Sequence, residues 1–196
     1  MIIAKGAEAV IRLENGIVIK ERIRKNYRIE ELDYKLRKSR TSIEAKVMKL
    51  CRENGILCPN VIDYNDFEIR MEYIDGKKLS DSFSLDLMKE LGKTVAKMHN
   101  INIIHGDLTT SNVMIKDNKL YIIDFGLAKI SKKIEDKATD IFTLKEALKA
   151  NHTELWEKAF NIFISEYKNV SIEKDKILER YYDIEKRRRY YENSNY

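Results

Sequence analysis

The sequence is poor in the residues from which disulfide-rich and metal-binding proteins are built. Its 196 residues include 2 cysteines, 3 histidines and 1 proline. Cys51 and Cys58 match neither a zinc-ligand spacing nor a disulfide framework, and the histidines show no zinc-ligand spacing. No apolar run reaches membrane-spanning length, and Met1 is followed by strand-like residues, not by a signal peptide. We therefore expect a cytoplasmic protein with reduced thiols and no membrane association.

Charged residues are abundant instead, with positive charge in slight excess. They make up 35% of the chain, and 37 lysines and arginines exceed 32 acidic residues to give a net charge of +5. The apolar fraction of 43% is sufficient for the core of one domain or of two small lobes. The positive charge is unevenly placed and gathers in two clusters. They comprise Arg22, Arg24, Lys25 and Arg28, and Lys186, Arg187, Arg188 and Arg189.

Turn residues divide the chain into short strands and amphipathic helices. Asn15-Gly16 joins two β-rich runs and predicts a tight hairpin. Asp117-Asn118 joins a second pair of short strands, residues 113–115 and 120–123. Further strands are expected over residues 61–64 and 67–74. Residues 21–40 are polar, basic and helix-compatible, with one apolar stripe at Ile29, Leu32 and Leu36. Helices are expected from Thr41 to a stop at Gly55, over residues 85–100, from Asp140 onward, and over residues 153–168 and 172–191.

The second hairpin fixes the spacing of three polar side chains. Asp107 and Asn112 precede it, and Asp124 follows it directly, before Phe125-Gly126. Phosphoryl transfer needs such a set, because one carboxylate orients the attacking hydroxyl or water while an amide and a second carboxylate hold Mg²⁺ against the phosphates. The alternative is an ordinary hairpin flanked by polar loops.

This pattern resembles the catalytic loop and the metal-binding loop of the protein-kinase superfamily, in which Asp and Asn have the spacing H-x-D-x-x-x-x-N. The resemblance implies that Asp107 is the catalytic base or positions water, and that Asn112 and Asp124 bind the Mg²⁺ of Mg-ATP. It also implies a two-lobed α+β fold. We expect a small lobe with an antiparallel sheet and helices over residues 1–75, and a reduced, mostly helical lobe over residues 76–196.

The run Ile17-Val18-Ile19-Lys20 resembles the kinase strand whose lysine reaches the α- and β-phosphates. Strand alternation places Val18 on the same face as Lys20, so Val18 would cover the adenine. The alternative is a surface lysine at a strand end. Glu44 is the candidate ion-pair partner of Lys20, although with Thr41 it would also complete a capping box. The ion pair is favoured, because the kinase arrangement needs an acid here and no other residue fits.

Two further segments occupy positions at which kinases contact the nucleotide. The first lies where a glycine-rich loop would cover the phosphates, but it lacks the G-x-G-x-x-G pattern, and a strand turn explains it equally well. It comprises Lys5, Gly6, Ala7, Glu8 and Ala9. The second resembles the hinge: Met71 would lie behind the adenine, the Glu72 carbonyl would accept from its amino group, and the Ile74 amide would donate to the ring. An edge strand followed by a turn is the competing interpretation.

The chain also departs from ordinary protein kinases. Gly106 replaces the arginine that grips a phosphorylated activation loop, and no A-P-E motif follows Gly126. Thr109 stands where Ser/Thr kinases carry a lysine that neutralises the transferred phosphate. Asp140 resembles the buried acid that binds the backbone of the catalytic loop, with a plain helix N-cap as the alternative.

Four segments together resemble the Bud-type small atypical kinases of the KEOPS complex, which are related to the RIO kinases. They are residues 5–9, 40–45, 105–112 and 124–128, and the resemblance covers nearly the whole chain. It implies an ATP- and Mg²⁺-dependent serine/threonine kinase or ATPase. Its partners would be the threonylcarbamoyl-transferase subunit and a small KEOPS subunit, and it would support threonylcarbamoyl-adenosine modification of tRNA. The C-terminal basic run would contact the partner or the tRNA backbone, although most such runs are solvated helix ends.

Two other functions remain open. One is a small-molecule phosphotransferase of the aminoglycoside or choline type, which also uses H-G-D-x-x-x-x-N. Such enzymes usually have a larger C-terminal half and lack Asp-Phe-Gly, so the short chain argues against this function. The other is a non-catalytic pseudokinase scaffold, which would lack Lys20, Asp107 or Asp124, whereas all three are present.

Overall fold

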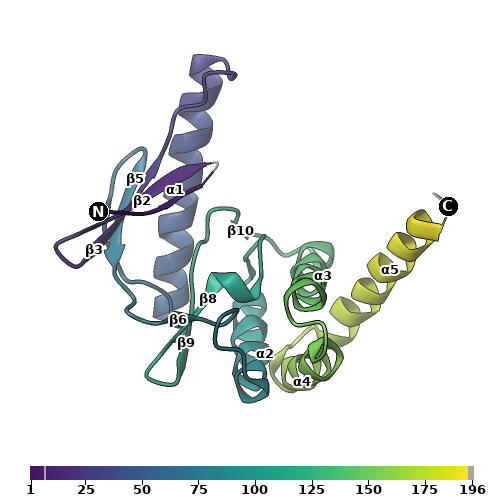
Figure 1. The fold of residues 1–196 in the computed structure, drawn as a ribbon. Coiled ribbons are helices and arrows are strands. Elements are labelled where there is room, and N and C mark those ends of the chain that lie inside the picture. Colours follow the sequence, from purple (N-terminus) through teal and green to yellow (C-terminus); the bar gives the residue numbers. More distant parts are fainter. Residues whose placement is uncertain (7, 194–196) are drawn as a thin grey trace.

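The computed structural model describes residues 1–6 and 8–193, and side chains as far as Arg188. An antiparallel sheet with one long helix, α1, forms the N-terminal half, and short strands with four further helices form the C-terminal half (Figure 1). This arrangement confirms the predicted α+β fold. The predicted boundary between residues 75 and 76 stays a prediction. Ala7 of the predicted phosphate loop lies outside the described residues.

The N-terminal sheet has five strands in the order β1-β2-β3-β5-β4. Its first hairpin is the one predicted: Glu14 pairs with Ile17, so the connecting loop is Asn15-Gly16 alone. Both loop residues have positive φ angles, 50° and 76°, which suit the right-handed twist of the flanking strands. The strands are β1 Ile2–Lys5, β2 Ala9–Glu14, β3 Ile17–Arg22, β4 Val61–Tyr64 and β5 Glu68–Glu72.

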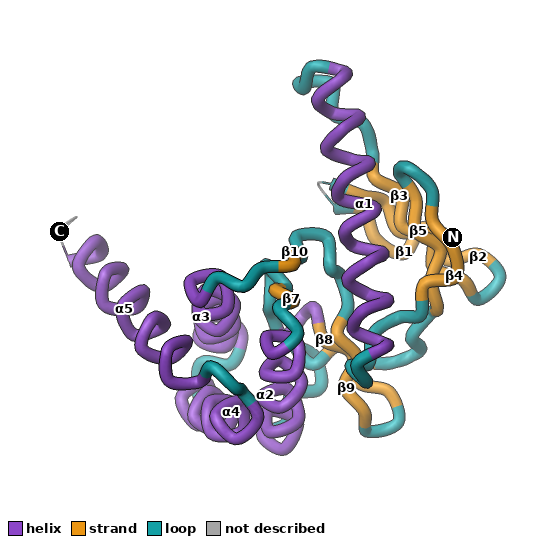
Figure 2. The backbone as a smooth tube through the Cα atoms, turned by 180° about the vertical axis from the view of Figure 1, so that it is seen from behind, coloured by secondary structure: helices purple, strands orange, loops and turns teal. Residues whose placement is uncertain are grey.

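Helix α1, Glu30–Glu53, begins well before Thr41, so the predicted start of this helix was wrong. Thr41 lies in the helix interior, and its hydroxyl donates to the carbonyl oxygen of Arg37 at 2.8 Å. The capping-box interpretation was therefore wrong as well. Three acidic residues in the first turn favour the earlier start, because negative charge is stabilising at a helix N-terminus. The helix runs along the sheet and projects beyond it (Figure 2).

The C-terminal half is built around α2, Leu85–Asn100, whose bounds match the predicted helix. Helix α3 begins at Ile134, so Asp140 lies inside it and the N-cap alternative was wrong. The remaining elements are β6 Lys77–Lys78, β7 Ile103–Ile104, a single 3₁₀ turn over Thr110–Asn112, β8 Val113–Lys116, β9 Lys119–Ile122, β10 Lys129–Ile130, α3 Ile134–Asn151, α4 Trp156–Val170 and α5 Lys174–Asn193.

One hydrophobic core runs from α1 through both halves to α5. Helices α2 and α4 pack closely at Gly92, where a β carbon would come within 2.5 Å of the Phe163 carbonyl oxygen. The thiols of Cys51 and Cys58 are fully buried and free. Among the described residues, no helix combines the length and the apolar character needed to cross a bilayer. The continuous core fixes the sheet and the helices on either side of the predicted site.

Candidate active site

The β8–β9 hairpin brings Asn112 and Asp124 to the same end of the fold. Asp117 and Asn118 form its two-residue turn with φ angles of 50° and 56°, and Val113 pairs with Ile122 at the open end. The Ile123 amide then donates to the Asn112 carbonyl oxygen at 2.9 Å. Residues that flank the hairpin on both sides are therefore neighbours, as the spacing predicted.

Asn112 also contacts Asp107. The Asn112 Nδ2 donates to the Asp107 carbonyl oxygen at 2.9 Å and to its Oδ2 at 3.0 Å. Because both bonds use the amide nitrogen, the amide oxygen is the atom with which Asn112 would bind a cation. The side chains of Asp107 and Asn112 thus form one unit at the rim of the catalytic loop.

Asp140 supports this loop from below. Its Oδ2 accepts from the His105 amide at 2.6 Å, and its Oδ1 accepts from the Gly106 amide at 2.8 Å. The His99 Nε2 lies 3.4 Å from Asp140 Oδ2. The other ring nitrogen of His99, Nδ1, lies 2.8 Å from the Tyr167 hydroxyl. Asp140 is buried, so two backbone N–H groups and a histidine satisfy its oxygens in the absence of water. The predicted contact between Asp140 and the catalytic-loop backbone is confirmed.

Lys20 connects the sheet, α1 and the metal-binding loop. Its Nζ lies 2.5 Å from Glu44 Oε1 and 2.7 Å from Asp124 Oδ1, so the predicted ion pair with Glu44 is present. Burial alone would lower the pKa of Lys20, but the charges of Glu44 and Asp124 and their hydrogen bonds hold this pKa above its usual 10.5. Lys20 is thus a cation at any physiological pH.

The same contact acts on Asp124. Burial alone would raise the pKa of Asp124, but the charge and hydrogen bond of Lys20, with the Gly126 amide, hold it below its usual 3.8. The Asp124 side chain is 47% exposed, so its oxygens face solvent as well as Lys20. An ionised and accessible carboxylate of this kind is a suitable ligand for Mg²⁺.

Arg22 is a site residue that sequence reasoning missed. In the sequence it belongs to a basic cluster, and in the structure it is only 4% exposed. Its Nη2 lies 2.6 Å from Glu44 Oε2 and 3.4 Å from the Gly126 carbonyl oxygen. The available signal was its position two residues after Lys20, because residues i and i+2 of a strand lie on the same face.

Two cavities meet at Lys20 and Asp124. The first has a volume of about 350 Å³ and lies against the predicted hinge. Its walls include Val18, Glu44, Met71, Glu72, Ile74 and Asn112. Apolar walls with a few convergent polar groups are typical of small-ligand sites of this size. The cavity therefore fits a flat aromatic ring beside a polar end that carries a cation and two oxygen ligands.

The second cavity, of about 310 Å³, lies under the β1–β2 turn. Its walls include Gly6, Glu8, Ala9, Arg22, Arg40 and Asp107. Glu8 ties this turn to the rest of the sheet half, with Arg28 at 3.1 Å and Arg40 at 2.9 Å. Lys5 is exposed at the end of β1 and does not line either cavity. Of the predicted phosphate-loop residues, Gly6, Glu8 and Ala9 are therefore placed beside the candidate site.

Gly126 lies close against these groups. A β carbon at this position would lie 3.0 Å from Asp124 Oδ1, 3.3 Å from Lys20 Nζ and 3.6 Å from Arg22 Nη2. Two cations and a carboxylate therefore converge on the backbone at Gly126. Such a donor set fits a phosphate group with a divalent cation.

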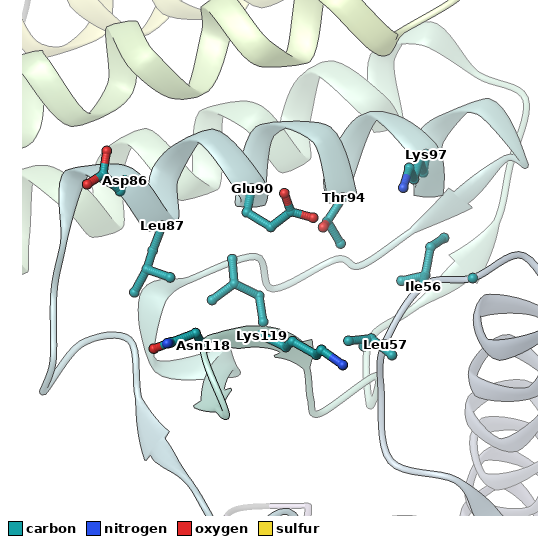
Figure 3. Close-up of a pocket in the computed structure, with 11 residues that line it drawn as sticks. Ile56, Leu57, Asp86, Leu87, Glu90, Thr94, Lys97, Asn118 and Lys119 are labelled. Atoms are coloured by element: carbon teal, nitrogen blue, oxygen red, sulfur yellow. The ribbon is translucent and has the colours of Figure 1, made fainter.

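A third cavity, of about 360 Å³, lies away from these residues (Figure 3). On one side it is bounded by Leu87, Glu90 and Lys97 of α2. On the other side it is bounded by the β8–β9 hairpin, through Asn118 in the turn and Lys119 at the start of β9. None of the predicted site residues lines it. The predicted site residues that line a cavity therefore all lie at the first two.

The sequence is similar to a known domain family and to individual proteins of archaea. Residues 12–143 match the RIO domain. The chain is 39% identical to the "Probable serine/threonine-protein kinase BUD32 homolog" of Archaeoglobus fulgidus, with 95% of each chain covered. It is 38% identical to the "KEOPS complex subunit Bud32" of Pyrococcus abyssi, over 98% of this chain and 97% of the relative.

A longer protein is also similar. The "Probable bifunctional tRNA threonylcarbamoyladenosine biosynthesis protein" of Methanocaldococcus jannaschii is 43% identical over 97% of this chain, which spans 37% of that relative's length. Among solved structures, the Rio2 kinase from Chaetomium thermophilum matches with a TM-score of 0.62 and 19% identity, over 90% of this chain and 63% of that one. WaaP matches with a TM-score of 0.66 and 14% identity, over 94% of this chain and 87% of that one, so both show similarity of fold.

Proposed function

The chain belongs to the RIO-domain family of atypical kinases, and from this premise we propose that it binds ATP with Mg²⁺ and acts as a serine/threonine kinase or ATPase. The observation that carries the proposal is the placement of Lys20, whose Nζ bonds to both Glu44 and Asp124. Asp107 lines the cavity under the β1–β2 turn and Asn112 lines the hinge cavity, and their side chains bond to each other where the two cavities meet. Lys20, Asp107, Asn112 and Asp124 thus converge where a nucleotide's terminal phosphate would bind.

Each of these residues has a role that its chemistry supports. Lys20 would bind the α- and β-phosphates, and Glu44 would hold the Lys20 ammonium in place. Asp107 would orient the attacking hydroxyl or water and accept its proton. Asn112 and Asp124 would hold Mg²⁺ through their side-chain oxygens. When bound there, Mg²⁺ neutralises the charge on the phosphate oxygens.

The hinge cavity supports the assignment of the adenine site. Val18 would cover the ring, Met71 would lie behind it, and the backbone of Glu72 and Ile74 would bind its edge. The described residues of the predicted phosphate loop, Gly6, Glu8 and Ala9, border the phosphate end of the site. Ring and phosphates would then lie on either side of Lys20.

We further propose that the chain acts within a KEOPS complex that produces threonylcarbamoyladenosine in tRNA. The support is the names of the relatives from Pyrococcus abyssi and Methanocaldococcus jannaschii. Its partners would be the threonylcarbamoyl-transferase subunit and a small KEOPS subunit, in the cytoplasm, where tRNA is modified.

The basic run on α5 is the candidate contact with tRNA. Lys186 and Arg187 are exposed, whereas the Arg188 guanidinium lies 5.2 Å from the centre of the Phe142 ring. The Arg189 side chain lies outside the described residues. Removing residues from Lys186 onward should reduce the salt dependence of tRNA affinity, because each phosphate contact releases counterions. An unchanged slope would reject the contact.

An ATP-hydrolysis assay tests the proposed function. We expect Mg²⁺-dependent turnover that rises when the transferase partner and tRNA are added. Asp107→Ala and Asp124→Ala should abolish turnover while the protein still melts cooperatively, whereas Asp86→Ala on the exposed surface of α2 should behave as wild type. Turnover stimulated only by a sugar or an amino alcohol would instead indicate a small-molecule phosphotransferase. A wild-type protein without any turnover or nucleotide binding would indicate a scaffold.

A further inference from the structure

Glu44 is shared by two cations. Its Oε1 lies 2.5 Å from Lys20 Nζ, and its Oε2 lies 2.6 Å from Arg22 Nη2. All three side chains are buried, with exposed fractions of 7% for Lys20, 4% for Arg22 and 2% for Glu44. Because each carboxylate oxygen is committed to a different cation, the carboxylate cannot rotate to follow Lys20 without breaking its bond with Arg22. Arg22 therefore fixes the orientation of Glu44.

Arg22 also contacts the metal-binding loop. The same Nη2 that binds Glu44 lies 3.4 Å from the Gly126 carbonyl oxygen. A single guanidinium thus joins β3, helix α1 and the loop that carries Asp124. Among the described residues, the ion pair that joins β3 to this loop is that of Lys20 with Asp124.

The Lys20–Asp124 contact and the Arg22–Gly126 contact should respond differently when Mg-nucleotide binds. On the proposed function, the phosphates bind Lys20 and Mg²⁺ binds Asp124, so the Lys20–Asp124 contact weakens as both residues turn to the ligand. Arg22 bonds to Glu44 and to a backbone carbonyl, and neither acceptor is a proposed ligand of the metal. The connection through Arg22 can therefore persist in both states.

We propose that Arg22 is a positioning residue: by holding Glu44 and the Gly126 carbonyl, it keeps Lys20 and Asp124 aligned with or without nucleotide. The inference rests on the proposed function and adds to it a means of keeping the site assembled without a phosphorylated activation loop. It also accounts for a buried cation whose Nε has no hydrogen-bond partner in the described structure. Such a group costs stability and is a poor choice for a purely structural role.

This energetic argument separates positioning from stability. In Arg22→Met the new side chain fills similar space, and Glu44 keeps Lys20 as its cation, while its Oε2 loses the bond with Arg22. We expect a lower melting temperature, because a buried acceptor is left unpaired, and a fall in kcat per folded molecule for ATP hydrolysis of at least about tenfold. Arg22→Lys retains the charge but is shorter, so it should bind Glu44 without reaching Gly126 and restore only part of kcat.

The matched control is Arg12→Met on the neighbouring strand β2. Arg12 also pairs with a carboxylate, Glu21, at 2.5 Å, but it lies outside the site. This variant should keep the kcat of wild type. If Arg22→Met has the same kcat and KM as Arg12→Met, or loses activity only in proportion to unfolded protein, the positioning role is rejected.

A second measurement does not depend on turnover. Hydrogen exchange of the segment 124–128 in nucleotide-free protein should be faster in Arg22→Met than in wild type, and unchanged in Arg12→Met. Unchanged exchange in Arg22→Met would contradict the inference even if the enzyme is active. Absence of turnover and of Mg-nucleotide binding in wild type would contradict the proposed function, and the exchange result would still decide whether Arg22 holds the loop.

Discussion

Gly106 lies directly against the backbone of Leu127. A β carbon on Gly106 would come within 2.3 Å of the Leu127 carbonyl oxygen, and the φ angle of Gly106 is +81°. The segment that follows the metal-binding loop therefore packs onto the catalytic loop at a position where no other residue fits. This contact gives a structural reason for glycine where ordinary kinases have arginine, and it holds the segment in place without a phosphate.

Gly106→Ala should therefore lower both stability and activity. The matched control is Gly16→Ala, because Gly16 has a similar φ of +76° but no atom within 4 Å of the added carbon. The control should lose about 1 kcal/mol from backbone strain alone. In Gly106→Ala the unfolding free energy should fall by about a further 1–3 kcal/mol because of overpacking, and kcat should also fall. Equal losses of unfolding free energy in denaturant titrations of the two variants would contradict the close contact.

Asp140→Asn tests the support of the catalytic loop. Asp140 accepts from the amides of His105 and Gly106, one on each oxygen. Asparagine has one acceptor oxygen, so one of these N–H groups would face an NH₂ group. We expect a loss of about 2–4 kcal/mol in unfolding free energy and a large fall in kcat. A variant with wild-type kcat would show that the loop does not need this contact.

Tyr167→Phe tests the outer end of the same network. The Tyr167 hydroxyl lies 2.8 Å from His99 Nδ1, and both side chains are fully buried. Removing the hydroxyl should cost about 1 kcal/mol, measured by chemical denaturation. Tyr34→Phe, which removes a hydroxyl bonded to Asp66 at the surface, should cost much less. Similar losses in the two variants would contradict a buried network centred on Asp140.

The pKa of Asp124 predicts a pH dependence of stability. Because this pKa is lower in the folded protein than its usual 3.8, ionised Asp124 stabilises the fold above the unfolded-state pKa. That contribution is lost as the pH falls through the folded-state pKa. The difference in unfolding free energy between wild type and Asp124→Asn should be constant above about pH 5.5 and shrink on further acidification. A difference in unfolding free energy that stays unchanged down to about pH 2.5 would contradict the ion pair with Lys20.

The parts of the fold that local sequence determines could be predicted. Asn15-Gly16 and Asp117-Asn118 specify their hairpins through positive φ angles, and the family resemblance was correctly identified from the motif residues. The start of α1 was predicted too late because Thr41 and Glu44 have the spacing of a capping box, although residues 21–40 are also compatible with a helix. The Thr41 hydroxyl does not cap a helix start, because α1 already continues through this position and the hydroxyl bonds to the Arg37 carbonyl oxygen instead.

Arg22 could not be placed from local pattern alone. Its burial depends on Glu44 in α1 and on Gly126 in the metal-binding loop, both of which are brought to it by tertiary packing. The same holds for Asp140, whose partners are the backbone amides of a loop more than thirty residues away. Strand periodicity places Arg22 on the face of Lys20 but does not identify its partners, and only the motif resemblance indicated the contact of Asp140.

Calorimetric titration of ADP or a non-hydrolysable ATP analogue tests the central claim most directly. The account predicts that wild type binds the nucleotide in the presence of Mg²⁺. Affinity should fall at least about tenfold in Lys20→Met and in Asp124→Asn, and not in the surface control Asp86→Asn. Equal affinity in wild type, Lys20→Met and Asp124→Asn would show that the nucleotide does not bind between these residues.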